Sequence, residues 1–392
     1  MNTNTESSER LQRTETLPVI QVFRPYLRED VIQAAVDVMR SGWLGTGPKT
    51  KQFEQEFKNY LETPGSCVAT MSATSALELA MNLLEIEAGD EIITTPITFV
   101  STNHVILYAN AIPVFADVDK HTGNILPASI EARITDKTKA IVVVHLSGYA
   151  CDMEKIEGIA EKYNLKIIED CAHAAGGVYH NGKHKNKKIG SSNNICCFSF
   201  QAVKNISCGD GGMLVLPAGL KQRAMQLRWM GIDKDTFSRT NRTGEYLWKY
   251  DVPELGIRAN PNDIMSAMGV AQLKYVEVDN ARRRTIATFY KDKLSVFPDI
   301  TLPDIDIAQS ACHFYPVYVK DRDGLLSFLS ASNIFVGVHY RRNDKYASYI
   351  TAELPNAEYI ENHTITLPIH LLLTDADLQR IVDTIETYYS GI

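Results

Sequence analysis

The chain has 392 residues, a length typical of one large and one smaller domain rather than of a single core. Its 40 basic and 47 acidic residues give a formal net charge of −7, and the basic residues are scattered, which argues against nucleic acid as the main partner. No run of about 20 apolar residues occurs, so we expect no membrane span.

The chain contains seven cysteines at irregular spacing. An odd number without regular pairing is atypical of a disulfide framework, and no spaced Cys and His pairs suggest a zinc site. We therefore predict a cytoplasmic protein without a bound metal. Its cysteines are expected to act as small buried side chains.

The first part of the chain predicts an α/β domain over residues 18–260. Residues 1–17 are polar and lack an apolar signal core, so we expect a disordered tail. Residues 28–62 predict two helices around a turn at 41–48. Apolar strands then alternate with helices: strands at 68–71, 91–95, 112–116, 140–145 and 165–169, and helices at 76–84, 100–109 and 152–163. This alternation predicts a largely parallel central sheet.

The pattern changes after residue 260 and predicts a smaller α+β domain over residues 261–392. The expected elements are a long helix from 262 into the 290s, strands at 314–319 and 336–340, and helices at 323–332 and 375–389. Thr374 and Asp377 have the spacing of a capping box at the start of the last helix.

Lys204 is the first candidate for chemistry. It follows the apolar run 198–200 and precedes the glycine-rich turn 209–212. A lysine held in such surroundings can lose its charge and become a nucleophile. Upstream, Asp170 follows an apolar strand, so we expect it at the carboxyl end of the sheet, where sites of α/β proteins form. Each residue alone would more often lie on the surface.

A lysine and a buried acid in this order are what a pyridoxal phosphate site requires. The lysine amine holds the cofactor covalently but reversibly. A buried carboxylate keeps the pyridine nitrogen protonated, so that the ring can accept electrons. Lys204 and Asp170 are the candidates for these two roles.

The remaining cofactor contacts have candidates as well. The phosphate needs N–H donors at a helix start and hydroxyl groups, which Ala73, Thr74 and Ser199 supply. Phe99 is the candidate for the face of the ring. His173 could reach the ring hydroxyl or orient the acid. Singly, these residues have commoner roles as helix caps or core side chains, and only their joint order predicts the cofactor.

These segments resemble the DegT/DnrJ/EryC1/StrS family of sugar aminotransferases, which have the fold-type I architecture of aspartate aminotransferase. The similar segments are residues 42–48, 72–77, 98–100, 113–119, 169–173 and 198–212, within a similarity that runs from residue 22 to the last helix. The resemblance implies the following roles: Lys204 as the Schiff-base lysine, Asp170 on the pyridine nitrogen, Ala73, Thr74 and Ser199 on the phosphate, Phe99 stacked on the ring, and His173 near the ring hydroxyl.

The resemblance also implies the reaction and the assembly. The expected enzyme uses pyridoxal 5′-phosphate to move an amino group from a donor, expected to be glutamate, to a keto group of a nucleotide-linked deoxy sugar. The expected homodimer has its active sites at the subunit interface. Arg258 falls where the family often has an asparagine that reaches the partner's cofactor phosphate, and a guanidinium would suit a phosphate better than an amide.

Three other functions compete with this interpretation. A sugar 3-dehydratase of the same family would carry histidine at the position of Lys204. A non-catalytic, cofactor-binding regulatory protein would be expected to lack the lysine or the acid. Amination of a cyclitol ketone is poorly distinguished by sequence. Candidate sugar contacts lie in three segments: residues 42–48, 313–315 and 338–342.

Overall fold

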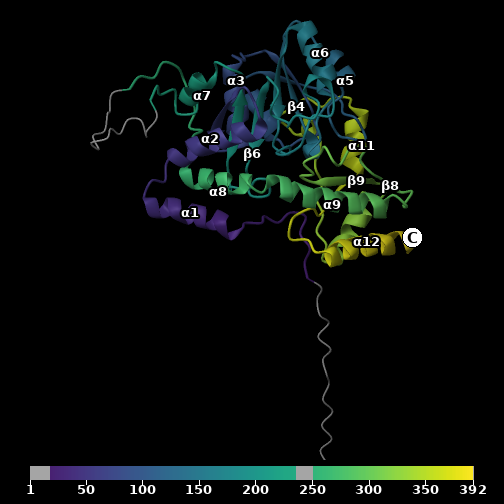
Figure 1. Ribbon diagram of the computed structural model, residues 1–392. Coiled ribbons are helices and arrows are strands. Elements are labelled where there is room, and N and C mark those ends of the chain that lie inside the picture. Colours follow the sequence, from purple (N-terminus) through teal and green to yellow (C-terminus); the bar gives the residue numbers. More distant parts are fainter. Residues whose placement is uncertain (1–17, 235–249, 392) are drawn as a thin grey trace, which may run out of the picture.

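A computed structural model describes residues 18–234 and 250–391, so the expected tail at 1–17 lies outside the described residues (Figure 1). The larger sheet consists of β1 (Ser66–Thr70), β2 (Glu91–Thr94), β3 (Ile112–Phe115), β4 (Thr138–Val144), β5 (Lys166–Asp170), β6 (Ile195–Ser199) and β7 (Gly212–Leu216). Its strand order is β1-β7-β6-β5-β4-β2-β3. Only β7 runs antiparallel to its neighbours, which confirms the predicted α/β fold with a mostly parallel sheet.

Helices cover both faces of this sheet. One face is covered by α2 (Pro48–Leu61), α5 (Pro127–Glu131), α6 (Met153–Tyr163) and α8 (Asp263–Leu273), and the other by α3 (Ala73–Leu83), α4 (Ser101–Tyr108) and α7 (Lys221–Leu227). Along β4, Ile141 and Val143 pack against the first layer, whereas Ala140 and Val142 pack against the second. From residue 140 to residue 144 the strand is apolar because both of its sides are buried there.

A smaller antiparallel sheet lies in the C-terminal part of the chain. Its order is β10-β9-β8, with β8 (Ile300–Thr301), β9 (Tyr315–Val319) and β10 (Thr364–Leu367). The helices α9 (Val276–Leu294), α10 (Arg322–Ala331), α11 (Pro355–His363) and α12 (Asp375–Ser390) share a second core with it. Short 3₁₀ segments occur at Leu146–Gly148, Gly182–His184 and Asn343–Lys345.

The predicted strand at 336–340 is wrong. Gly337 makes one pair of backbone hydrogen bonds with Thr366 of β10, and no ladder continues from it. The β-branched residues of this segment suggested a strand. Instead, the chain leaves the sheet so that His339 and Tyr340 line a cavity.

The predicted long helix from residue 262 is also wrong, because it is divided into α8 and α9 at residues 274–275. The break lets two end-to-end helices join different cores (Figure 1). Val270 and Leu273 of α8 pack under the larger sheet, beside α1 (Glu29–Ser41) and α2, whereas Ile286 of α9 packs in the C-terminal core. A domain boundary at residue 260 therefore stays a prediction.

The predicted capping box and the predicted turn at 41–48 are each held by specific hydrogen bonds. Thr374 and Asp377 form both hydrogen bonds of a capping box at the start of α12, as predicted. The turn at 41–48 is held by Asp263, whose carboxylate accepts the backbone N–H groups of Gly47, Lys49 and Thr50 at the start of α2. A Cβ atom on Gly47 would lie 2.2 Å from the indole nitrogen of Trp43, so the close approach requires glycine.

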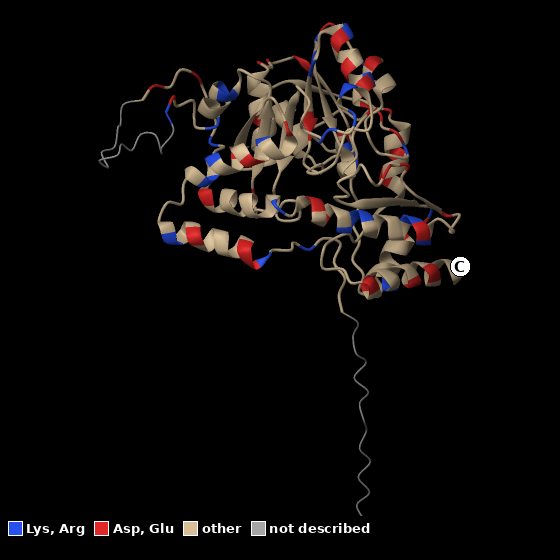
Figure 2. Ribbon diagram, in the orientation of Figure 1, with Lys and Arg blue, Asp and Glu red and all other residues tan. Residues whose placement is uncertain are grey.

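Surface features agree with the composition. Acidic and basic residues are interspersed along the outer helices (Figure 2). Every helix in the described part of the chain is too short or too polar to cross a bilayer. All seven cysteines are buried and unpaired, as expected for small apolar side chains.

Candidate active site

All of the residues predicted to hold the cofactor line one cavity of about 400 Å³. Asp170 and Ser199 are the last residues of β5 and β6, so the cavity lies at the carboxyl end of the parallel strands. This edge of the sheet is where ligands of α/β proteins bind, because the loops that follow the strands converge there. The structure therefore brings together residues that are up to 131 positions apart, from Ala73 to Lys204.

Lys204 has the electrostatic character that an amine nucleophile needs. Its Nζ lies 3.3 Å from Nε2 of His313. Burial lowers the pKa of Lys204 to about 8, although the neighbouring Asp170 carboxylate acts in the opposite direction. Near neutral pH a usable fraction of the lysine is therefore uncharged, in the direction expected from its surroundings.

Asp170 is a buried carboxylate with two protein donors. Its oxygens accept the Thr102 hydroxyl at 2.8 Å and the Ala172 amide at 3.0 Å. Burial raises the pKa of Asp170, while these hydrogen bonds and Lys204 oppose the shift. A cationic partner in the cavity would stabilise this carboxylate. Sequence reasoning missed Thr102, which lies on α4 and has no local signal linking it to the acid.

The N-terminus of α3 has the features of an anion-binding site. Ser72 caps the helix by accepting the Ser75 amide, and both bonds of a capping box are present. Ala73 and Thr74 form the first turn, where N–H groups have no partner within the helix and the helix dipole is positive. Ser199 adds a hydroxyl from the end of β6. This arrangement fits a phosphate group.

The residues predicted for the ring also reach the cavity. Phe99 is 58% exposed, so it belongs to the cavity wall and not to the core. His173 is buried, and its Nε2 lies 3.1 Å from the Tyr340 hydroxyl. Its Nδ1 is buried without a hydrogen-bond partner among the described residues. A bound group with a hydroxyl would satisfy that nitrogen, which fits pyridoxal phosphate.

Three cavity residues come from the C-terminal part of the chain: His313, His339 and Tyr340. The sequence suggested them only as sugar contacts. His313 stacks on His173 with ring centroids 4.8 Å apart, and it also stacks on Phe23 with ring centroids 5.5 Å apart. Burial and the nearby Lys204 hold the pKa of His313 well below its usual range.

The other suggested sugar contacts lie elsewhere. Phe314 and Tyr315 do not line the cavity among the described residues, and Arg342 is committed to a buried pair with Asp344 at 2.7 Å. The side chain of Arg341 is 60% exposed. These arginines are therefore not arranged as a clamp at the cavity.

Comparison with known proteins decides the family. The model of the DegT/DnrJ/EryC1/StrS aminotransferase family matches residues 25–386. The chain belongs to this family. Because the family depends on pyridoxal phosphate, the protein is a pyridoxal phosphate-dependent sugar aminotransferase, and the predicted fold and cofactor are confirmed.

Three relatives illustrate the similarity of this aminotransferase. The spore coat polysaccharide biosynthesis protein SpsC of Bacillus subtilis is 34% identical over 382 residues, which cover 94% of this chain and 96% of SpsC. The aminotransferase TlmJ of Streptoalloteichus hindustanus is 30% identical, with a TM-score of 0.87 over 95% of this chain and all of TlmJ. Helicobacter pylori PseC, an aminotransferase involved in pseudoaminic acid biosynthesis, is 28% identical, with a TM-score of 0.86 over 96% of this chain and all of PseC.

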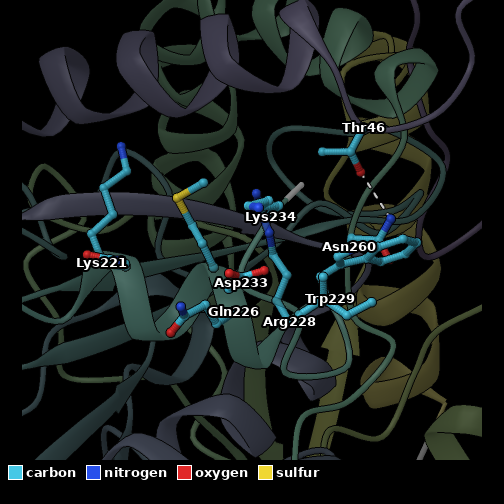
Figure 3. A pocket seen from close by; sticks show the side chains of 11 residues that line it. Thr46, Lys221, Gln226, Arg228, Trp229, Asp233, Lys234 and Asn260 are labelled. Atoms are coloured by element: carbon cyan, nitrogen blue, oxygen red, sulfur yellow. Dashed lines mark hydrogen bonds between the residues drawn. The ribbon is translucent and has the colours of Figure 1, made fainter. Parts of the chain in front are cut away.

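The aminotransferase has a second cavity, of about 340 Å³, that contains none of the predicted cofactor residues (Figure 3). The amide of Asn260 donates to the Thr46 hydroxyl at 3.0 Å across its rim. Arg228, which also lines it, is paired with Glu54 at 2.7 Å. Thr46 of the 42–48 segment thus lines this second cavity and is absent from the wall of the first.

Beside Asp170, the aminotransferase buries a second acid. Glu169 is completely buried and accepts four side-chain donors at 2.6–2.7 Å: His145, Tyr179, Ser192 and Asn194. These donors fill the acceptor positions of the carboxylate, so they leave none for an ion. Although burial alone would raise its pKa, these hydrogen bonds outweigh burial and lower the pKa of Glu169 to about 2.

Glu169→Gln is expected to lower the free energy of unfolding by about 3 kcal/mol at pH 7, because the new amide group would face donors. The folded pKa is depressed from 4.5 to about 2, so this stabilisation is present above pH 4.5 and is lost as pH falls through 2. Chemical denaturation of wild type and variant should therefore show a difference that shrinks over this range. Ser192→Ala removes one donor only and should cost about 1 kcal/mol. A pH-independent difference would contradict the assignment.

Proposed function

We propose that this aminotransferase transfers the amino group of glutamate to the keto group of a nucleotide-linked deoxy sugar. The observation that carries the proposal is the single cavity that gathers Lys204, Asp170 and the start of α3. The cavity offers an amine with a pKa lowered by burial to about 8, a buried acid and an anion-binding end. These groups match the parts of pyridoxal phosphate.

The binding roles follow from the chemistry of each group. When bound, pyridoxal phosphate supplies an electron-accepting ring that stabilises negative charge on the substrate carbon. Ala73 and Thr74 would bind the phosphate through backbone N–H groups, with the Ser199 hydroxyl beside them. Asp170 would hold a proton on the ring nitrogen through an ion pair. Phe99 would cover the face of the ring.

Lys204 would move the proton that leaves the substrate carbon. Its amine would hold the resting cofactor covalently and, once released by the amino donor, take the proton from the substrate carbon and deliver it to the cofactor. A histidine at this position would suit dehydration, so lysine favours amino transfer. His173 would bond the ring hydroxyl through its buried, unpartnered Nδ1.

The assembly is proposed to be a homodimer that shares its sites. Arg258 is exposed, with its guanidinium 4.4 Å from the centre of the Trp229 ring, and would reach the partner's cofactor phosphate. The backbone N–H groups of Met71 and Met230 donate to the carbonyls on either side of Arg258. Both methionines are 46% exposed, which favours a covering partner. If sites are shared, mixing inactive Lys204→Ala and Arg258→Ala subunits restores activity. If activity did not recover after subunit exchange, the proposal of shared active sites would be contradicted.

Transfer of ¹⁵N from labelled glutamate tests the reaction. The protein, loaded with pyridoxal phosphate, is incubated with a panel of nucleotide-linked keto-deoxyhexoses, and mass spectrometry follows the label. The expected result is ¹⁵N in an amino sugar that remains linked to its nucleotide. Label in the matching free sugars or in a cyclitol ketone, but in none of the nucleotide sugars, would overturn the proposed acceptor. Label retained by glutamate, with transfer from another amino acid, would overturn the proposed donor.

A further inference from the structure

The effect of His313 on Lys204 depends on which imidazole nitrogen of His313 carries the hydrogen. Nε2 of His313 lies 3.3 Å from Nζ of Lys204. If Nε2 carried the proton, it would donate to the lone pair of a neutral lysine and block it. If Nε2 carries a lone pair instead, the lysine donates an N–H and keeps its own lone pair free. The position of one imidazole proton therefore decides whether the amine can react.

A chain of hydrogen bonds places that proton. Nδ2 of Asn280 donates to the carbonyl of Ala175 at 2.9 Å, which leaves its Oδ1 to accept Nδ2 of Asn205 at 2.7 Å. The same Nδ2 of Asn205 also donates to the carbonyl of Ala311 at 2.7 Å. Because backbone carbonyls only accept, the orientation of both amides is determined.

The amide orientation in turn determines the tautomer of His313. Oδ1 of Asn205 lies 3.1 Å from Nδ1 of His313. An amide oxygen only accepts, so Nδ1 must carry the hydrogen. The charged or titratable groups that face His313 are Lys204, His173, Arg283 and His339, and each of them, like burial, lowers the pKa of His313. The ring is therefore neutral, with its one hydrogen on Nδ1 and a lone pair on Nε2.

We propose that His313 positions the reacting amine: its Nε2 accepts one N–H of Lys204 and turns the lone pair of the lysine toward the cavity. Nitrogen lone pairs and N–H bonds of an amine point in different directions, so anchoring one N–H restricts where the lone pair can point. No proton is transferred between the two residues in this contact. The inference rests on the proposed role of Lys204 and extends it to a residue 109 positions away.

The tautomer can be read directly. The full-length protein with ¹⁵N-labelled histidine is examined by NMR without cofactor, and then with pyridoxamine phosphate, the form that leaves Lys204 free. The expected spectrum shows a neutral His313 with its hydrogen on Nδ1, assigned by loss of the signal in His313→Gln. A hydrogen on Nε2, or a charged ring at pH 7, overturns the proposal. Neither result depends on any sugar substrate.

Two variants test the contact with the amine. His313→Phe keeps the stacked ring but has no acceptor, whereas His313→Gln keeps an oxygen that can accept from Lys204. The rate at which an acylating reagent modifies Lys204 is measured against pH by mass spectrometry. The lost acceptor favoured the ammonium form, so the midpoint in His313→Phe should fall by about one pH unit, while His313→Gln stays near wild type.

A remote histidine provides the matched control. His370 is also buried, and burial lowers its pKa to about 4, but it contacts the carbonyl of Gln21 and not the cavity. His370→Phe should leave the Lys204 midpoint unchanged. An unchanged midpoint in His313→Phe, or equal shifts in the Phe and Gln variants, overturns the proposal. If borohydride fixes the cofactor to another lysine, the role of Lys204 fails instead, so the two failures are distinguishable.

Discussion

Lys204→Ala is expected to reduce amino transfer by about 10⁴-fold or more, because the residue is proposed both to hold the cofactor and to move the proton. Among the described residues that line the cavity, Lys204 is the one lysine. Its loss should leave the fold intact, since the side chain faces the cavity and its one described hydrogen-bond partner is His313. Transfer of ¹⁵N from glutamate measures the first effect, and circular dichroism measures the second.

Two further observations separate catalysis from structure in this experiment. Borohydride reduction of the loaded wild-type protein should fix the cofactor on the peptide that contains Lys204, and no such peptide should form in the variant. Lys204→Arg keeps a positive charge but should be as inactive as Lys204→Ala. If either variant transferred amino groups at a rate within tenfold of wild type, Lys204 would have no catalytic role.

Asp170→Asn is expected to lower turnover by about 10²–10⁴-fold while making the cofactor-free protein more stable. The amide cannot form an ion pair with a protonated ring nitrogen, so the cofactor would accept electrons less well. The gain in stability has a separate cause. Asp170 is 4% exposed, and burial raises its pKa above the ordinary value of 3.8. A buried carboxylate without a full ionic partner costs free energy that the amide does not.

The gain in stability of Asp170→Asn is expected to depend on pH. The unfolded chain releases the proton of Asp170 near pH 3.8, whereas the folded chain retains it to a higher pH. The carboxyl group therefore costs stability as pH rises from 3.8 through the folded pKa. Thermal unfolding without cofactor should show an advantage of Asp170→Asn that is small at pH 4 and larger at pH 7. A stability advantage of Asp170→Asn that decreases as pH rises would contradict this prediction.

Thr102→Val provides a graded comparison for Asp170. It removes the hydroxyl that donates to the carboxylate at 2.8 Å but keeps the charge. We expect a loss of turnover of about tenfold, which corresponds to one ordinary hydrogen bond. A loss as large as that of Asp170→Asn would mean that the hydroxyl, and not the charge, dominates.

Local motifs explain how much of the site could be predicted. Lys204, Asp170 and the Ala73–Thr74 helix start are each recognisable within a few residues of sequence, because a strand end, a helix start and a glycine-rich turn are local features. The contact of Lys204 with His313 spans 109 positions and depends on how the C-terminal part packs against the larger sheet. No local pattern encodes such packing.

The two errors in the fold have the same origin. Residues 336–340 have the composition of a strand, but whether they pair depends on the neighbouring strand, and Gly337 is the one residue of this segment whose backbone hydrogen bonds to β10. The break between α8 and α9 falls at Lys274 and Tyr275, where neither proline nor glycine marks it. In both places the tertiary packing, which the local sequence does not report, decides the backbone path.

The adjacent residues Glu169 and Asp170 at the end of β5 point to opposite sides of the sheet, because side chains alternate along a strand. Glu169 lies in a closed network of donors, whereas Asp170 lines the cavity. A mutational scan that measures protein abundance and amino-transfer activity separately should therefore give opposite results for these two residues. Substitutions at Glu169 would lower the abundance of the protein, and substitutions at Asp170 would leave abundant protein without activity.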